Sequence, residues 1–164
     1  MHETGEGPVT TAPTQLPTAA WAVAWAFVVG QVLALFTHGT QPEENWPLSA
    51  LVGVAVVTFF SHGVLRARMV RFWLVTCLSG VAVVGYLVVL ADGGSVVELL
   101  DLVMTAVQLG CLVWLYRTPW FAWQRTRPEG GPSLAPLMLL AMLVGVLAGV
   151  IGVESSAVRV NVSV

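Results

Sequence analysis

The hydrophobic residues of this chain fall into five long stretches that carry few charges, separated by short polar segments. A helix needs about 20 residues to cross a hydrocarbon layer about 30 Å thick, and each stretch approaches that length. A membrane β-barrel would instead show apolar and polar residues in alternation, which these stretches lack. The pattern therefore predicts an all-α polytopic membrane helical bundle with about five transmembrane helices, spanning residues 19–153. The expected helices are residues 19–36, 47–65, 72–91, 97–116 and 134–153.

The two ends of the chain differ from this pattern. Residues 1–18 contain Pro8, Pro13 and Pro17 and no basic residue, so they are predicted to be a disordered tail and not a cleavable signal, which begins with positive charge. Residues 154–164 are predicted to be a tail on the other side of the membrane. Its last residues, 158–164, alternate apolar and polar side chains, as strands do. A lone strand is unstable, so pairing with a partner chain, folding over the bundle and disorder all remain open.

Charge gives the expected orientation. All seven basic residues are arginines, and six of them lie in two clusters, one between the second and third helices and one between the fourth and fifth. Cytoplasmic loops carry the excess of arginine and lysine, so both clusters are predicted to be cytoplasmic, with the N-terminus inside and the C-terminus outside. No basic residue precedes the first helix, so its orientation is inferred only from the alternation of the later loops between the two sides of the membrane. The clusters are Arg66, Arg68 and Arg71, and Arg117, Arg125 and Arg127.

The amino-acid composition indicates where the protein is located in the cell. Hydrophobic residues make up 57% of the chain and charged residues 10%, which is far from the balance of a soluble domain. The exclusive use of arginine, with much valine, alanine and glycine, is typical of a GC-rich bacterial genome. We therefore expect a multi-pass protein of the bacterial cell membrane. Residues 117–125 interleave aromatic side chains with arginines, a pattern that predicts a segment lying flat on the inner surface with its rings at headgroup level.

Rows of small residues recur at every fourth position in the first and last helices. Such rows let helix backbones approach closely in a membrane, where the packing of side chains drives association. They predict one packing face on each helix, used either within the bundle or against a partner subunit or a second copy of the chain. The rows are Ala22, Ala26, Gly30 and Ala34, and Ala141, Gly145 and Gly149.

The fourth helix carries a polar stripe whose spacing of three and four residues keeps it on one side of the helix. Ionisable groups at membrane depth are costly and usually face a bundle interior or a water-filled path. The stripe therefore has two interpretations: a proton or cation relay that opens to the outside, or a solvated first turn followed by hydrogen bonds to neighbouring helices. Gln31 on the first helix and Ser61 on the second are positioned where they could face it, whereas His62, four residues before Arg66, is expected near the headgroups. The stripe consists of Glu98, Asp101, Thr105 and Gln108.

Other chemistry is sparse. No nucleophile, phosphate-binding or metalloprotease motif occurs, and no basic surface adequate for nucleic acid is present. His38, Glu43 and Glu44 have the chemistry of metal ligands but no specific spacing, so neither a metal nor another cofactor is expected. The favoured hypothesis is a non-catalytic accessory or scaffolding subunit in the lipid bilayer, associated with a membrane protein partner or a second copy. The alternative is a transport or proton-conducting component that uses the polar stripe.

Overall fold

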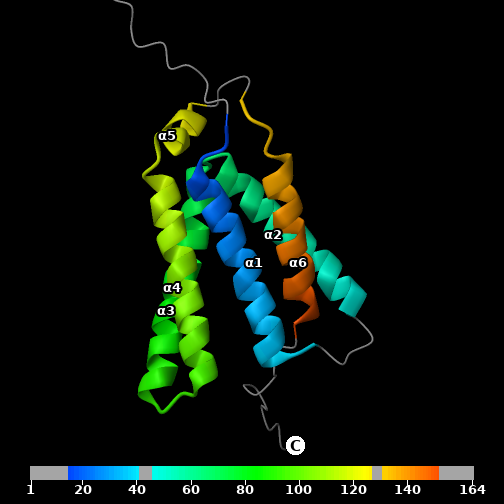
Figure 1. Cartoon of the computed structure of the whole chain (residues 1–164), viewed down its shortest axis with the longest axis vertical. Coiled ribbons are helices and arrows are strands. Elements are labelled where there is room, and N and C mark those ends of the chain that lie inside the picture. The colour runs from blue at the N-terminus through cyan, green and yellow to red at the C-terminus, as the bar shows by residue number, and fades with distance from the viewer. Residues whose placement is uncertain (1–14, 41–45, 127–130, 152–164) are drawn as a thin grey trace, which may run out of the picture.

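The computed structural model describes residues 15–40, 46–126 and 131–151, which form an all-α helical bundle (Figure 1). Helices α1 to α4 are each long and apolar enough to cross a membrane, so the predicted class, a multi-pass membrane bundle, is confirmed. Helix α6 has 16 residues and rises only about 24 Å, at 1.5 Å per residue. The helices are α1 (Thr18–His38), α2 (Trp46–Leu65), α3 (Met69–Ala91), α4 (Val96–Tyr116), α5 (Pro119–Arg125) and α6 (Ala135–Val150).

The expected helix boundaries for α1, α2 and α4 agree with the structure to within two residues. The last helix ends at Val150, earlier than the expected residue 153, because Ile151 is already extended and forms an isolated β-bridge with Thr40. This bridge ties the end of α6 to the end of α1. The tails at residues 1–14 and 152–164, including the predicted strand, lie outside the described residues.

Helix α3 begins at Met69, three residues before the expected position. The connection from α2 is short because Ala67 adopts a left-handed conformation, with φ of 47°. The Ala67 amide donates to the Val64 carbonyl at 3.0 Å, and the Arg68 amide donates to the Gly63 carbonyl at 2.9 Å. These two bonds form a Schellman motif, which usually has glycine at the left-handed position. The motif ends α2 and lets α3 start directly after Arg68.

Helices α2 and α6 form the most closely packed pair in the bundle. Glycines from both helices meet at their contact: a Cβ added to Gly145 would lie 2.5 Å from the Cα of Val54 and 2.8 Å from the carbonyl oxygen of Gly53. A Cβ added to Gly149 would collide with the backbone of Ala50. The absence of side chains at these glycines therefore sets the separation of α2 and α6, which we call the α2–α6 seam.

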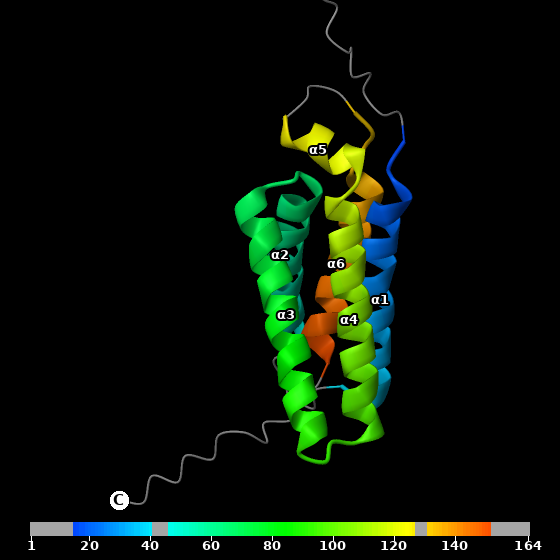
Figure 2. The ribbon, with the colours of Figure 1, turned by 90° about the vertical axis from the view of Figure 1, so that its left-hand side faces the viewer.

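The main hydrophobic core lies at one end of the bundle. There α5 runs across the ends of the longer helices (Figure 2). It begins where the hydroxyl of Thr118 accepts a hydrogen bond from the Phe121 amide, with Pro119 in the first turn. Trp120 is 5% exposed and Phe121 is 1% exposed, so these two rings face the protein interior, while their position at headgroup level stays a prediction. Both rings are inserted into the protein, where the ring of Phe121 packs 5.0 Å from that of Phe72.

Candidate functional site

The polar stripe of α4 begins with a helix cap. Glu98 accepts a hydrogen bond from the Ser95 amide at 2.8 Å and also pairs with the Ser95 hydroxyl, which in turn accepts from the Val97 amide. This reciprocal arrangement is a capping box, which satisfies amides that the first helical turn leaves free. The carboxylate of Glu98 therefore starts the helix.

Asp101, one turn further along, contacts α1. Its Oδ2 lies 3.0 Å from Nε2 of His38, the last residue of α1. The side chain of Asp101 is 11% exposed and that of His38 is 39% exposed. Sequence reasoning missed this pair, because 63 positions separate the two residues and only the packing of α1 on α4 brings them together.

The deeper part of the stripe is also paired. The hydroxyl of Thr105 donates to the carbonyl of Asp101 at 2.7 Å, and Nε2 of Gln108 donates to the carbonyl of Ala26 on α1 at 3.3 Å. A Cβ added to Gly30 would meet the Gln108 amide, so glycine leaves the room that this side chain occupies. Each of the four stripe residues thus has a partner within the described chain, and two of the partners belong to α1.

The two small-residue rows have different neighbours. In the first row, Ala26 and Gly30 lie beside Gln108 of α4, whereas Ala22 and Ala34 are partly buried. In the second row, Gly145 and Gly149 lie in the α2–α6 seam. Ala141, the remaining member of the second row, is 7% exposed and lines a half-open cavity between the helices. Members of both rows therefore pack within the molecule.

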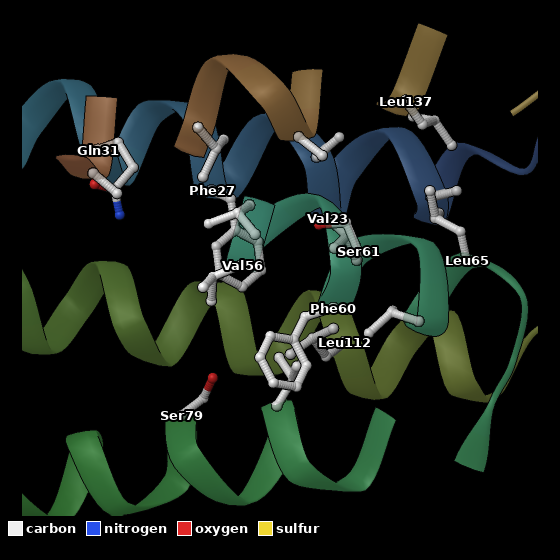
Figure 3. Close-up of a pocket in the computed structure, with 18 of the residues that line it drawn as sticks. Val23, Phe27, Gln31, Val56, Phe60, Ser61, Leu65, Ser79, Leu112 and Leu137 are labelled. Carbon is white, nitrogen blue, oxygen red and sulfur yellow. The ribbon is translucent and has the colours of Figure 1, made fainter. Parts of the chain in front are cut away.

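That cavity, of about 260 Å³, lies between α1, α2, α3, α4 and α6. Its lining is mostly aliphatic and aromatic, with polar side chains contributed by Gln31, Ser61 and Ser79 (Figure 3). Phe27 and Phe60 lie among them. Gln31 and Ser61, two residues that could have faced the α4 stripe, line this cavity, and no stripe residue does so. The described polar stripe and the cavity are therefore separate features.

Arginines of both clusters meet at the end of the bundle where α5 lies. Arg66, Arg68, Arg71 and Arg125 line one open pocket of about 530 Å³, together with Ala67, Met69 and Val70. We call it the arginine pocket. Arg117 caps the end of α4 but does not line the pocket, and Arg127 lies outside the described residues.

Metal-ligand chemistry is not assembled in the part of the chain that the structure describes, which holds no group of three His, Cys, Asp or Glu side chains. His38 pairs with Asp101, while Glu43 and Glu44 lie outside the described residues. Cys77 is exposed and Cys111 is partly buried, and both are free thiols.

Comparison with known proteins gives no further assignment. No protein-family model, curated protein or solved structure matched the chain.

Proposed function

We propose that this chain is a non-catalytic accessory or scaffolding subunit of a membrane assembly, with its arginine-rich end in the cytoplasm. One observation carries the proposal: all four polar side chains of the α4 stripe are engaged within the bundle. Glu98 caps α4, Thr105 bonds to the backbone of its own helix, and Asp101 and Gln108 join α4 to α1. A relay requires polar groups that can exchange partners along a path. In this chain the stripe residues instead stabilise α4 and its packing against α1.

The glycines of the second small-residue row pack within the bundle, which is one of the two uses that their sequence predicted. Because Gly145 and Gly149 pack against α2, bulky substitutions there would damage the subunit before they damaged any interface. A test of association must therefore use the intact chain. Affinity isolation of the tagged chain from its native membranes in mild detergent is expected to return a stoichiometric complex with another membrane protein. Recovery of the chain by itself would contradict the proposal.

Transport is the second candidate, and the contact between His38 and Asp101 favours it. An imidazole and a carboxylate can both take up and release protons, and here the two groups are in contact at the end of α1. If the pair relays protons, liposomes containing the chain should dissipate a pH gradient faster than protein-free liposomes, and Asp101→Asn should abolish the difference.

The accessory proposal predicts the opposite result in the same assay. Liposomes that contain the chain should hold the gradient as long as protein-free ones, and Asp101→Asn should change nothing. Flux that disappears in Asp101→Asn and persists in Glu98→Gln, whose residue lies on the same stripe, would establish conduction through Asp101. That outcome would overturn the accessory role.

A further inference from the structure

We propose that the arginine pocket binds the phosphate group of an anionic lipid headgroup. The pocket lies where α5 and the α2–α3 turn meet, and it draws arginines from two segments separated by more than one transmembrane helix. Since α1 to α4 have the length and composition of membrane spans, the end of the bundle lies at the level of the headgroups.

The backbone holds two of these arginines on either side of a fixed turn. Arg66 and Arg68 flank Ala67, whose left-handed conformation and Schellman hydrogen bonds fix the connection. Ala67 itself is 5% exposed and belongs to the core. The arginines are therefore presented by a turn that is anchored in the protein, and little backbone entropy remains to be lost on binding.

Arg71 forms a fixed wall of the pocket. Its Nη1 donates to the Phe59 carbonyl at 3.1 Å, and its guanidinium carbon lies 3.6 Å from the centre of the Phe59 ring. The stem of the side chain packs over Gly63, where an added Cβ would lie 2.8 Å from the Cβ of Arg71. Arg71 thus keeps its positive charge in place by contacts that do not involve a carboxylate.

The other three arginines keep their donors available. In the described part of the chain, Arg66, Arg68 and Arg125 are exposed and form no side-chain hydrogen bond or ion pair with another residue. A guanidinium presents five N–H donors in a planar fork that fits two phosphate oxygens at once. The pocket therefore offers several such forks to one anion.

No described carboxylate neutralises this charge. Asp92, Glu98 and Asp101 are the acidic residues within the described ranges, and all three lie at the opposite end of α3 and α4. That end is about 30 Å away along a 21-residue helix, at 1.5 Å per residue, which exceeds the screening length of about 8 Å in physiological salt. Glu129 lies outside the described residues. A phosphate is the anion that the headgroup layer supplies at high density.

Lipid binding can be measured by native mass spectrometry of the full chain in neutral detergent, titrated with phosphatidylglycerol. One molecule of phosphatidylglycerol should bind in preference to phosphatidylcholine. Arg68→Gln and Arg125→Gln should each weaken it about fivefold, since an arginine near an anionic membrane contributes about 1 kcal/mol. Both residues are exposed, and the melting temperature of each variant without lipid is expected to remain that of the parent chain.

Arg117→Gln is the matched control, because it removes the same charge from the same end of the bundle outside the pocket. The affinity of this variant for phosphatidylglycerol should differ from that of the parent chain by less than twofold. Equal losses in Arg117→Gln and Arg125→Gln would overturn the proposal, because they would show diffuse attraction and no site. Arg125→Lys keeps the charge and loses the planar fork of N–H donors. Its affinity for phosphatidylglycerol should lie between those of Arg125→Gln and the parent chain.

Inorganic phosphate distinguishes the source of the anion. At millimolar concentration it should compete weakly with phosphatidylglycerol, because it lacks the membrane anchor that concentrates the headgroup at the pocket. Saturable binding of inorganic phosphate that depends on Arg68 and Arg125, without binding of phosphatidylglycerol, would overturn the assignment to a lipid.

Discussion

Gly145→Ala probes the α2–α6 seam directly. The added methyl carbon would lie 2.5 Å from the Cα of Val54 and 2.8 Å from the Val54 amide nitrogen, whereas carbon atoms in favourable contact are about 3.5–4.0 Å apart. Both obstructing atoms belong to backbone, so no side-chain rotation can relieve the contact. The helices must separate by about 1 Å, and overpacking of this kind costs about 1–3 kcal/mol.

The matched control is Gly110→Ala on α4. A Cβ at Gly110 meets no other atom within 4 Å, so the substitution has no steric cost and keeps the gain in helix propensity, about 1 kcal/mol, that alanine has over glycine. Because both variants share this gain, the difference between their free energies of unfolding reports the steric cost alone. Reversible unfolding in mixed micelles should show Gly145→Ala to be about 1–3 kcal/mol less stable than Gly110→Ala. Equal stabilities would refute the close backbone contact between α2 and α6.

Three further substitutions test other contacts by the same unfolding assay. Gly30→Ala should lower the free energy of unfolding by only about 1 kcal/mol, because the obstructing atoms belong to the movable side chain of Gln108. The hydrogen bond that Gln108 would lose contributes about that much or less in a membrane. A loss as large as that of Gly145→Ala would contradict this. Phe121→Ala truncates a buried aromatic side chain and should lower the free energy of unfolding by about 3–5 kcal/mol. The loss should clearly exceed that of Trp114→Ala, because Trp114 is 50% exposed. Equal losses would place α5 outside the core. Ser95→Ala should cost about 1 kcal/mol by removing the helix cap, and an unchanged stability would show that the capping box contributes nothing.

The helices themselves could be predicted because membrane spans depend on local composition. Long apolar runs have one stable solution in a bilayer, and the boundaries of α1, α2 and α4 followed from them. The start of α3 did not, because the apolar run that predicts this helix begins only after Arg71, whereas the helix begins at Met69. A Schellman turn with alanine at its left-handed position, as at Ala67, lacks the glycine that usually marks such a turn.

The contacts between helices were less predictable. Spacing showed that the stripe shares one side of α4, yet it did not identify His38 or Ala26 as the partners of Asp101 and Gln108. For α5, Thr118 followed by Pro119 is a recognisable helix start, but burial of Trp120 depends on the free space between the ends of the longer helices. These features arise from tertiary packing, which one sequence does not reveal.

The arrangement of the helices across the membrane is the claim on which the other proposals depend. Single cysteines at exposed positions test it, in a background in which Cys77 and Cys111 are replaced by alanine. Suitable positions are Gln15 before α1, Asp92 between α3 and α4, and Thr126 after α5, all exposed in the structure. Each variant is labelled with a membrane-impermeant maleimide in sealed vesicles of known orientation. Gln15→Cys and Thr126→Cys should react from the cytoplasmic side and Asp92→Cys from the opposite side only; reaction of Asp92→Cys and Thr126→Cys from the same side would contradict the account.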